Sequence, residues 1–201
     1  MSFLILIRHG QSVWNKENRF TGSKNIPLSA KGREEARFAA RKMKGLMIHA
    51  AFSSELRRAE ETRDIIMAEL KCENIILESN KALNEKNFGL LEGKNKDEMR
   101  LKYGDDKIEM WRKSFYATPP CGESLRDITP RVQTFYTKRI IPLLKSGKNV
   151  LLVGHSNSLK AIIMYVEKLD GEGIYNVMLK NAEPLVYKLD EELNVLKRSY
   201  L

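Results

Sequence analysis

The sequence predicts an α/β fold of three layers, with a mostly parallel central sheet flanked by helices. Two apolar runs of strand length support this class, Phe3 to Ile7 and Asn149 to Gly154. Unbroken apolar runs are typical of strands that are covered on both faces. Segments with apolar residues at helical spacing lie between these runs, and this alternation favours helices on both sides of one sheet.

The expected helices begin at recognisable capping residues. Ser29 predicts the N-cap of a helix that stops near Gly45, and helical spacing resumes over 54–70. Asn95, followed by Glu98, resembles the capping arrangement of a third helix.

The second half of the chain continues the alternation. Thr129 and Pro130 predict an N-cap followed by proline in the first turn of a helix. A further helix is expected over 159–166, directly after the second buried strand. The segments 184–189 and 194–196 then predict two late strands joined as a hairpin.

Length and composition predict one soluble globular domain over residues 1–201. No apolar run reaches the about 18 residues needed to span a bilayer. The first apolar run lacks a basic leader and a cleavage site, so a strand and a cytoplasmic location are expected. Cys72 and Cys121 are too few for a disulfide framework or a zinc site.

The net charge of +9 is consistent with an anionic partner, which could be nucleic acid, an acidic membrane surface or a small molecule. The basic residues are spread along the chain and are not interleaved with aromatic residues. A nucleic-acid-binding module would explain the charge, but it would not explain the histidine motifs described next. We therefore expect neither a nucleic-acid nor a membrane partner.

Two of the three histidines occupy equivalent places. His9 follows the first buried strand and His155 follows the second, 146 positions later. Ligands of open α/β sheets bind at the carboxyl ends of strands, so both imidazoles are expected at one crevice. His49 lies at an element boundary without a polar motif, which predicts a structural or exposed residue.

The neighbours of both histidines suit an anion better than a metal. Arg8 precedes His9, and a loop of small residues follows it, whose backbone amides are expected to face a phosphate. Ser156 and Asn157 follow His155 and open a helix, whose N-terminal end attracts anions. Neither segment supplies a third ligand at short spacing, so no metal site is expected.

An ordered series of motifs runs along nearly the whole chain. The series comprises LIRHGQS at 6–12, NRFTG at 18–22, SELRRA at 54–59, LNE at 83–85, GKNK at 93–96, WR at 111–112, ESL at 123–125 and GHSNS at 154–158. It resembles the cofactor-dependent phosphoglycerate mutases of the histidine phosphatase superfamily. The resemblance implies the fold of those mutases.

The resemblance also implies catalytic roles. His9 would take a phosphoryl group on nitrogen, and Arg8, Arg58 and His155 would surround that group. Glu85 would exchange a proton with the substrate hydroxyl. Substrate contacts are implied for ten further residues: Ser12, Asn15, Thr21, Gly22, Phe88, Lys96, Arg112, Lys113, Ser156 and Asn157.

Three of those positions depart from the family pattern. Phe88 stands where a tyrosine is usual, Lys113 where a second arginine is usual, and Ser156 where a glycine is common. The segment 120–123 is also shorter than in longer mutases. These differences spare the phosphoryl chemistry and affect the acceptor side.

The predicted function is interconversion of 3-phosphoglycerate and 2-phosphoglycerate in glycolysis and gluconeogenesis, through a phosphohistidine primed by 2,3-bisphosphoglycerate. The alternative is a phosphatase that uses the same histidines and transfers the group to water. Lys96 and Arg112 favour the mutase, whereas Phe88 and Lys113 lean toward the phosphatase. The resemblance is compatible with a homodimer, although no self-complementary patch specifies one.

Overall fold

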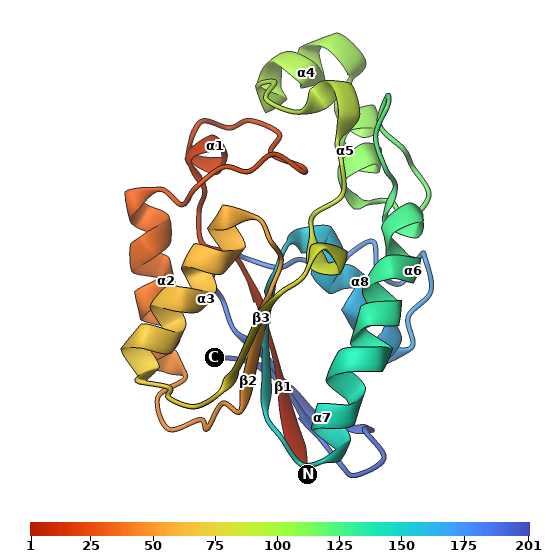
Figure 1. Ribbon diagram of the computed structural model, residues 1–201. Helices are drawn as coiled ribbons and strands as arrows, with labels where there is room; N and C mark the ends of the chain where they lie inside the picture. Colours follow the sequence, from red (N-terminus) through yellow and green to blue (C-terminus); the bar gives the residue numbers. More distant parts are fainter.

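The computed structural model describes residues 1–201, and it contains a six-stranded mixed sheet between two layers of helices (Figure 1). The strand order is β3-β2-β4-β1-β5-β6. The strands are β1 (Ser2–Arg8), β2 (Ala50–Ser53), β3 (Ile76–Ser79), β4 (Val150–Gly154), β5 (Leu185–Leu189) and β6 (Val195–Tyr200). The first four strands in this order run parallel to one another. β5 pairs antiparallel with β1, and β6 pairs antiparallel with β5. The predicted fold class is confirmed.

Eight α-helices connect and flank these strands: α1 (Val13–Lys16), α2 (Ala30–Lys42), α3 (Arg57–Leu70), α4 (Lys96–Tyr103), α5 (Asp105–Lys113), α6 (Leu125–Phe135), α7 (Ile141–Lys145) and α8 (Ser156–Glu167). Short 3-10 turns cover Lys81–Leu83 and Gly89–Leu91, and a π-helical turn, Tyr136–Ile140, joins α6 to α7. None of the helices is long and apolar enough to cross a bilayer.

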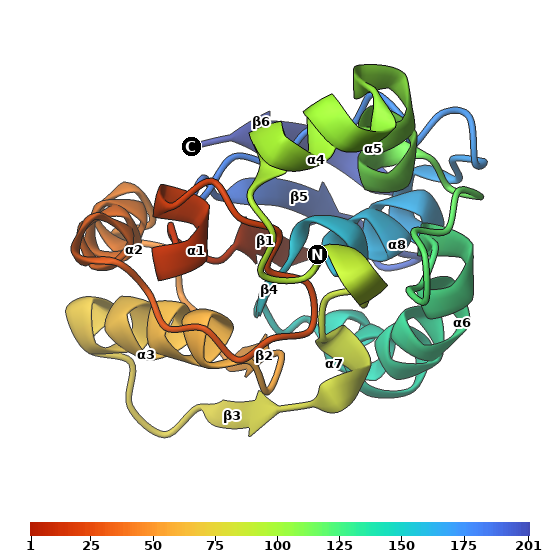
Figure 2. The ribbon, with the colours of Figure 1, turned by 90° about the horizontal axis from the view of Figure 1, so that it is seen from above.

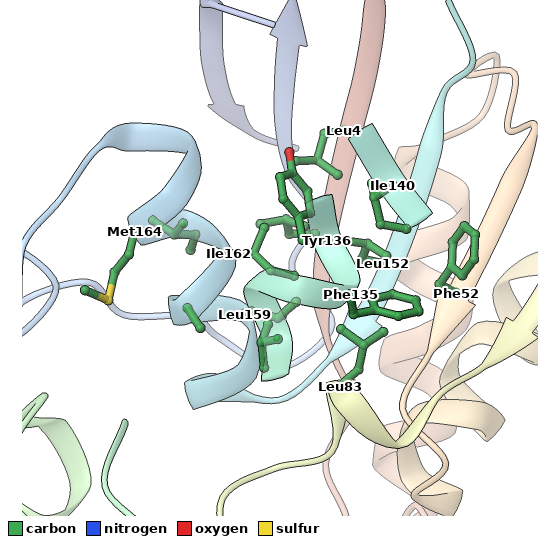
Figure 3. Close-up of a cluster of buried hydrophobic side chains, with 14 of the residues drawn as sticks. Leu4, Phe52, Leu83, Phe135, Tyr136, Ile140, Leu152, Leu159, Ile162 and Met164 are labelled. Carbon is green, nitrogen blue, oxygen red and sulfur yellow. The ribbon is translucent and has the colours of Figure 1, made fainter. Parts of the chain in front are cut away.

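Both faces of the sheet are covered, which explains the unbroken apolar runs. Leu4 and Leu6 of β1 belong to the core beneath α6, α7 and α8. Ile5 and Ile7 point to the opposite face, into the core beneath α2 and α3. Figure 2 shows the two helical layers on opposite sides of the sheet, and Figure 3 shows the first of these cores.

The two strands that precede the histidines are direct neighbours. β1 and β4 pair in parallel, and Arg8 lies opposite Gly154 at the end of the register. The backbone N–H of His9 donates to the carbonyl of Gly154 at 3.0 Å. His9 and His155 therefore leave the sheet side by side, although 146 positions separate them.

Most capping predictions are confirmed, and one is wrong. Ser29 caps α2, which ends at Lys42, and Asn95 caps α4. The helix expected to begin at Thr129 starts earlier, because Ser124 and Asp127 form a reciprocal capping box.

Pro130 consequently lies inside α6 and not in its first turn. A proline at this position removes one backbone donor from the helix. The hydroxyl of Thr129 donates to the carbonyl of Leu125 at 2.8 Å, which adds a side-chain bond in the same turn.

The loop that carries His9 packs unusually closely on α2. A methyl group at Gly10 would lie 2.3 Å from the carbonyl oxygen of Gly32, and one at Gly32 would lie 2.1 Å from the carbonyl oxygen of Gln11. These distances are far below van der Waals contact, and the opposing atoms belong to the backbone. Two glycines, which have no side chain, are therefore required where the loop after β1 crosses the first turn of α2.

We expect Gly32→Ala to displace the loop after β1 and to destabilise the protein by about 1–3 kcal/mol, the usual cost of overpacking. Denaturant unfolding would measure the loss, and phosphoryl transfer to His9 should fall with it. Lys31→Ala, an exposed position on the same helix, is the matched control. A fully stable and active Gly32→Ala protein would contradict the close approach.

Candidate active site

The two imidazoles meet at the carboxyl ends of β1 and β4. Their ring centroids lie 5.0 Å apart, with the ring planes tilted by 57°. Both side chains are buried, His9 to 4% exposure and His155 completely. The structure thus brings together the two histidines that the strand pattern placed at one crevice.

The hydrogen bonds of His9 select one tautomer. Nδ1 lies 2.7 Å from the carbonyl oxygen of Gly10, which can only accept, so Nδ1 carries the proton. Nε2 therefore keeps its lone pair, and it accepts a hydrogen bond from Nε of Arg58 at 3.2 Å. A neutral imidazole with a defined unprotonated nitrogen is suited to attack an electrophilic phosphorus, once the bond from Arg58 gives way to the ligand.

Arg58 is held in place by the loop that precedes α2. Its side chain is 1% exposed, and its terminal nitrogens donate to the carbonyls of Lys24 and Gly22 at 2.7 and 2.8 Å. Arg8, at the end of β1, donates to the carbonyl of Leu179 at 3.0 Å. Neither guanidinium forms an ion pair with a carboxylate, so both keep uncompensated charge beside His9.

Several buried polar atoms in this region have no partner. These atoms are Nε of Arg8, Oγ1 of Thr21 and Nδ1 of His155. The hydroxyl of Ser54 accepts from the backbone of Leu56 and lies 2.7 Å from Nε2 of His155. If that hydroxyl donates to Nε2, the neutral ring presents an unpaired N–H at Nδ1. Unpaired buried donors are costly, and an anion with several oxygen atoms would satisfy them.

The backbone amides of the His9 loop do not face the cavity, contrary to prediction. The amide of Gly10 donates to the hydroxyl of Thr62 at 3.1 Å, and that of Gln11 to the carboxylate of Glu35 at 2.8 Å. The amide of Ser12 donates to Oδ1 of Asn15. Side chains of the protein therefore use these donors, so an anion would have to be held by side chains instead.

Ser12 supports Asn15 and does not line the cavity. Its buried hydroxyl accepts from the backbone of Asn15 at 3.1 Å and caps α1. Because Oδ1 of Asn15 accepts from Ser12 in return, Nδ2 of Asn15 remains as a donor for a ligand.

The carboxylate of Glu85 lies at the N-terminal end of α8. One of its oxygen atoms accepts from the backbone of Lys86 at 2.9 Å, and the other accepts from that of Asn157 at 3.3 Å. A carboxylate is favourable at the N-terminal end of a helix. The sequence predicted an anion at this helix end, and the carboxylate of Glu85 already fills part of that role. Glu85 is only 8% exposed.

A cavity of about 150 Å³ opens over these groups. Thirteen predicted site residues line it: Arg8, His9, Asn15, Thr21, Gly22, Arg58, Glu85, Phe88, Lys96, Arg112, Lys113, Ser156 and Asn157. His155 lies beneath the lining with Ser12. Six residues that the sequence did not single out complete the wall: Arg19, Phe20, Lys160, Val177, Met178 and Leu179.

Some of these six could have been found from the sequence. Arg19 and Phe20 belong to a motif already singled out, and Lys160 follows Ser156 by four positions on one face of α8. The segment 177–179 carries no signal, because a long connection returns it to the site from outside any strand or helix.

The far end of the cavity is built on a separate apolar cluster. Phe20, Phe88, Leu91, Ile108 and Trp111 form this cluster beneath α4 and α5, which rise above the sheet edge (Figure 1). The buried phenyl ring of Phe88 lies 5.4 Å from that of Phe20. Phe88 therefore contributes an apolar wall where a tyrosine would offer a hydroxyl.

The basic residues of α5 already have an internal partner. Glu109 accepts from Arg112 at 2.7 Å and pairs with Lys113 at 2.6 Å. Partial burial opposes ionisation, but the Lys113 hydrogen bond and the neighbouring charges lower the pKa of Glu109. This carboxylate stays ionised and holds both cations at the cavity rim.

The cavity is strongly positive. Seven basic residues and one acidic residue line it. Burial, followed by the charges of Arg58 and Arg8, lowers the pKa of His9 well below 6.5. Burial and the charges of Arg58 and His9 do the same for His155. Burial beside Arg112 and Arg8 lowers the pKa of Lys96 to about 8.

No three His, Cys, Asp or Glu side chains are grouped so as to hold a metal ion. The groups that do converge are neutral imidazoles, cations and one carboxylate, which is a combination suited to the transfer of a phosphoryl group.

The chain matches one family model over nearly its whole length. The chain belongs to the histidine phosphatase superfamily (branch 1), whose family model matches residues 4–200.

Within that family, two similar relatives share one name, 2,3-bisphosphoglycerate-dependent phosphoglycerate mutase. The protein of Bradyrhizobium diazoefficiens is 44% identical over 197 residues, which cover 97% of this chain and 95% of that protein. The protein of Parvibaculum lavamentivorans is 41% identical over 202 residues, which cover 100% and 96%.

Solved structures of both activities share the fold. A mycobacterial glucosyl-3-phosphoglycerate phosphatase in complex with VO3 has a TM-score of 0.82 at 22% identity, covering 98% of this chain and 96% of that chain. A phosphoglycerate mutase of Bacillus anthracis has a TM-score of 0.77 at 24% identity, covering 100% and 92%. At these identities the likeness concerns the fold alone.

We expect the pKa of the His9 imidazole to lie well below 6.5 in the free protein. This pKa should rise when inorganic phosphate is added. The dianion would offset the charges of Arg58 and Arg8, which disfavour a second proton on the ring. Nitrogen-15 NMR of the histidine rings would measure both values, with His9→Asn to assign the signal. Titration near 6.5 without phosphate would contradict the electrostatics described above.

Proposed function

We propose that this protein is a 2,3-bisphosphoglycerate-dependent phosphoglycerate mutase, which interconverts 3-phosphoglycerate and 2-phosphoglycerate. The observation that carries the proposal is the unprotonated Nε2 of His9, on a ring held neutral inside a cavity lined by seven basic residues. The curated relatives support the choice of substrate, because the two reported above carry that name over nearly the whole chain.

In the first half-reaction, Nε2 of His9 attacks the phosphorus of a bound phosphate ester. The bond between phosphorus and the ester oxygen breaks, and Glu85 gives a proton to the leaving oxygen. Arg8 and Arg58 offset the charge on the equatorial oxygen atoms, and Nδ2 of Asn15 adds a neutral donor. Nδ1 of His155, whose ring lies beside that of His9, donates a further hydrogen bond to the phosphoryl group.

In the second half-reaction, the free hydroxyl of a bound monophosphoglycerate attacks the phosphohistidine and forms 2,3-bisphosphoglycerate, whose other phosphoryl group can then return to His9 and leave the isomer. Glu85 takes the proton of that hydroxyl, and the bond between nitrogen and phosphorus breaks as the new ester forms. Both directions require one carboxylate that alternates between acid and base. Glu85 is the sole acidic residue lining the cavity.

The residues of the cavity fit 2,3-bisphosphoglycerate as the primer that phosphorylates His9. The unpartnered Nε of Arg8 and Oγ1 of Thr21 supply buried donors at the inner end. Lys96, Arg112 and Lys113 supply positive charge at the outer end. Two anionic groups on one small molecule would therefore find a cation at each end.

The proposal extends to the setting of the enzyme. Small phosphorylated acids are its partners, and the reaction belongs to glycolysis and gluconeogenesis, which implies the cytoplasm. A homodimer stays a prediction.

The direct test is to incubate the protein with 3-phosphoglycerate, with and without bisphosphoglycerate, and to follow 2-phosphoglycerate and free phosphate together. We expect 2-phosphoglycerate to form much faster than phosphate, with a strong dependence on the primer. Rapid release of phosphate without the isomer would replace the mutase by a phosphatase.

One feature of the structure favours a phosphatase as the second candidate. Glu85 also borders a second cavity of about 510 Å³, which is lined by Asn84, Asn87 and Arg131 among others. This cavity would give water a route to the carboxylate that activates the acceptor. Slow hydrolysis beside the mutase reaction is consistent with it.

For Glu85→Gln, we expect mutase turnover to fall by a factor of about 100 or more, the usual contribution of a general acid or base. Phosphorylation of the enzyme by bisphosphoglycerate should slow as well, because Glu85 protonates the leaving oxygen in that step. Rapid-quench labelling would compare the two rates. His9→Ala, which should abolish acid-labile labelling, is the control, and an unchanged labelling rate in Glu85→Gln would remove Glu85 from the role of proton carrier.

A further inference from the structure

Lys160 is a buried cation that the reaction described so far does not use. It lies on α8, one turn after Ser156 and on the same face, and it lines the cavity. Its side chain belongs to a residue that is only 3% exposed. The surrounding residues of α8 are apolar core residues, so the lysine interrupts an otherwise apolar buried helix.

The ammonium of Lys160 lacks the partners that a buried charge requires. Its one hydrogen bond goes to the carbonyl of Tyr175 at 3.5 Å, the outer limit for such a bond. It takes part in none of the ion pairs of the protein. An ammonium carries three donors, and leaving a charge buried without partners is strongly unfavourable.

A neighbouring lysine shows what a satisfied buried ammonium looks like in this protein. Lys86 is completely buried, and its Nζ donates to the carbonyl of Trp111 at 2.8 Å and lies over the ring of Phe88 at 4.9 Å. Burial lowers the pKa of both Lys86 and Lys160 to about 8, and the charge of Glu85 opposes that shift in each. Lys160 alone lacks a close acceptor.

The position of Lys160 identifies the part of a ligand that it can reach. The charges of Lys113 and Arg112, both on α5, act on the ammonium of Lys160. Nζ of Lys113 lies over the ring of Tyr175, and the carbonyl of Tyr175 accepts the hydrogen bond from Lys160. Arg112 and Lys113 belong to α5, which packs on the apolar cluster, whereas Arg58 contacts His9 at the end of β1. The missing acceptor is therefore an anionic group other than the one that His9 receives.

We propose that Lys160 binds the second anionic group of the substrate, the carboxylate or distal phosphate, and so selects substrates with two anionic groups. The proposal rests on the proposed function, because that function defines the second group. Arg112 and Lys113 must exchange Glu109 for the ligand, whereas Lys160 gives up only one long hydrogen bond. The ligand thus satisfies Lys160 at little cost.

The test is to measure dissociation constants by calorimetry for 3-phosphoglycerate and for glycerol 3-phosphate, which lacks the carboxylate. In Lys160→Met we expect binding of 3-phosphoglycerate to weaken about 10- to 100-fold, as for the loss of a charged hydrogen bond. Binding of glycerol 3-phosphate should change less than about twofold. Lys160→Arg, which keeps the charge, should retain most of the discrimination.

Stability separates this role from a structural one. Replacing an unpaired buried ammonium by methionine should leave the melting temperature of the free protein unchanged or higher. A structural lysine would lower it. Should Lys160→Met not fold, Lys160→Gln provides the same comparison of the two ligands.

Equal weakening of both ligands, or no change in either, would overturn the proposal for Lys160. Neither result depends on the fate of the phosphoryl group, because the two constants are measured at equilibrium. A wild-type protein that released phosphate and formed no 2-phosphoglycerate would refute the mutase, and it would leave this comparison intact.

Discussion

The structure depends on a concentration of buried positive charge that the protein does not neutralise. Arg8, Arg58 and Lys160 all lie in the same cavity without a carboxylate partner, and Glu85 is the sole acidic residue in its lining. Burying unpaired charges destabilises a fold. The same arrangement makes a small anion the missing element of the site, because its oxygen atoms satisfy donors that otherwise have no acceptor.

The fold fixes the positions of the side chains that carry these charges. β1 and β4 deliver the two histidines in register, while α3 delivers Arg58 and Thr62 from the opposite side. The amides of the loop after β1 are tied to protein side chains, so the loop cannot rearrange to solvate an anion by itself. Recognition therefore passes to side chains whose positions are set in advance, which is the condition for electrostatic stabilisation of a transition state.

Chemistry and specificity occupy different ends of the cavity. The inner end consists of His9, Arg8 and Arg58, and its contacts run to the sheet and to backbone carbonyls. The outer end stands on the apolar cluster beneath α4 and α5. The departures at Phe88 and Lys113 lie there, so in the proposed reaction they would alter which acceptor is held and leave His9 unchanged. Glu109 further restrains this end, because a ligand must compete with it.

Much of the fold and most of the site could be predicted from the sequence. The apolar runs and the capping residues Ser29 and Asn95 specify their elements locally, because strand burial and helix capping depend on neighbouring residues. The start of α6 was misplaced, since two capping signals competed and the box formed by Ser124 and Asp127 prevailed over Thr129 and Pro130. The motif series also placed all but two of the predicted residues in the cavity lining.

The sequence by itself determined the class of fold, the pair of histidines and the basic residues around them, because each is encoded in a short contiguous pattern. Only the tertiary structure decided which donors remain free. It showed that the amides beside His9 are already used, that Ser12 supports Asn15, and that Lys160 lines the cavity with only one long hydrogen bond. Whether a polar group is satisfied depends on residues brought together from distant parts of the chain, and no local pattern records that pairing.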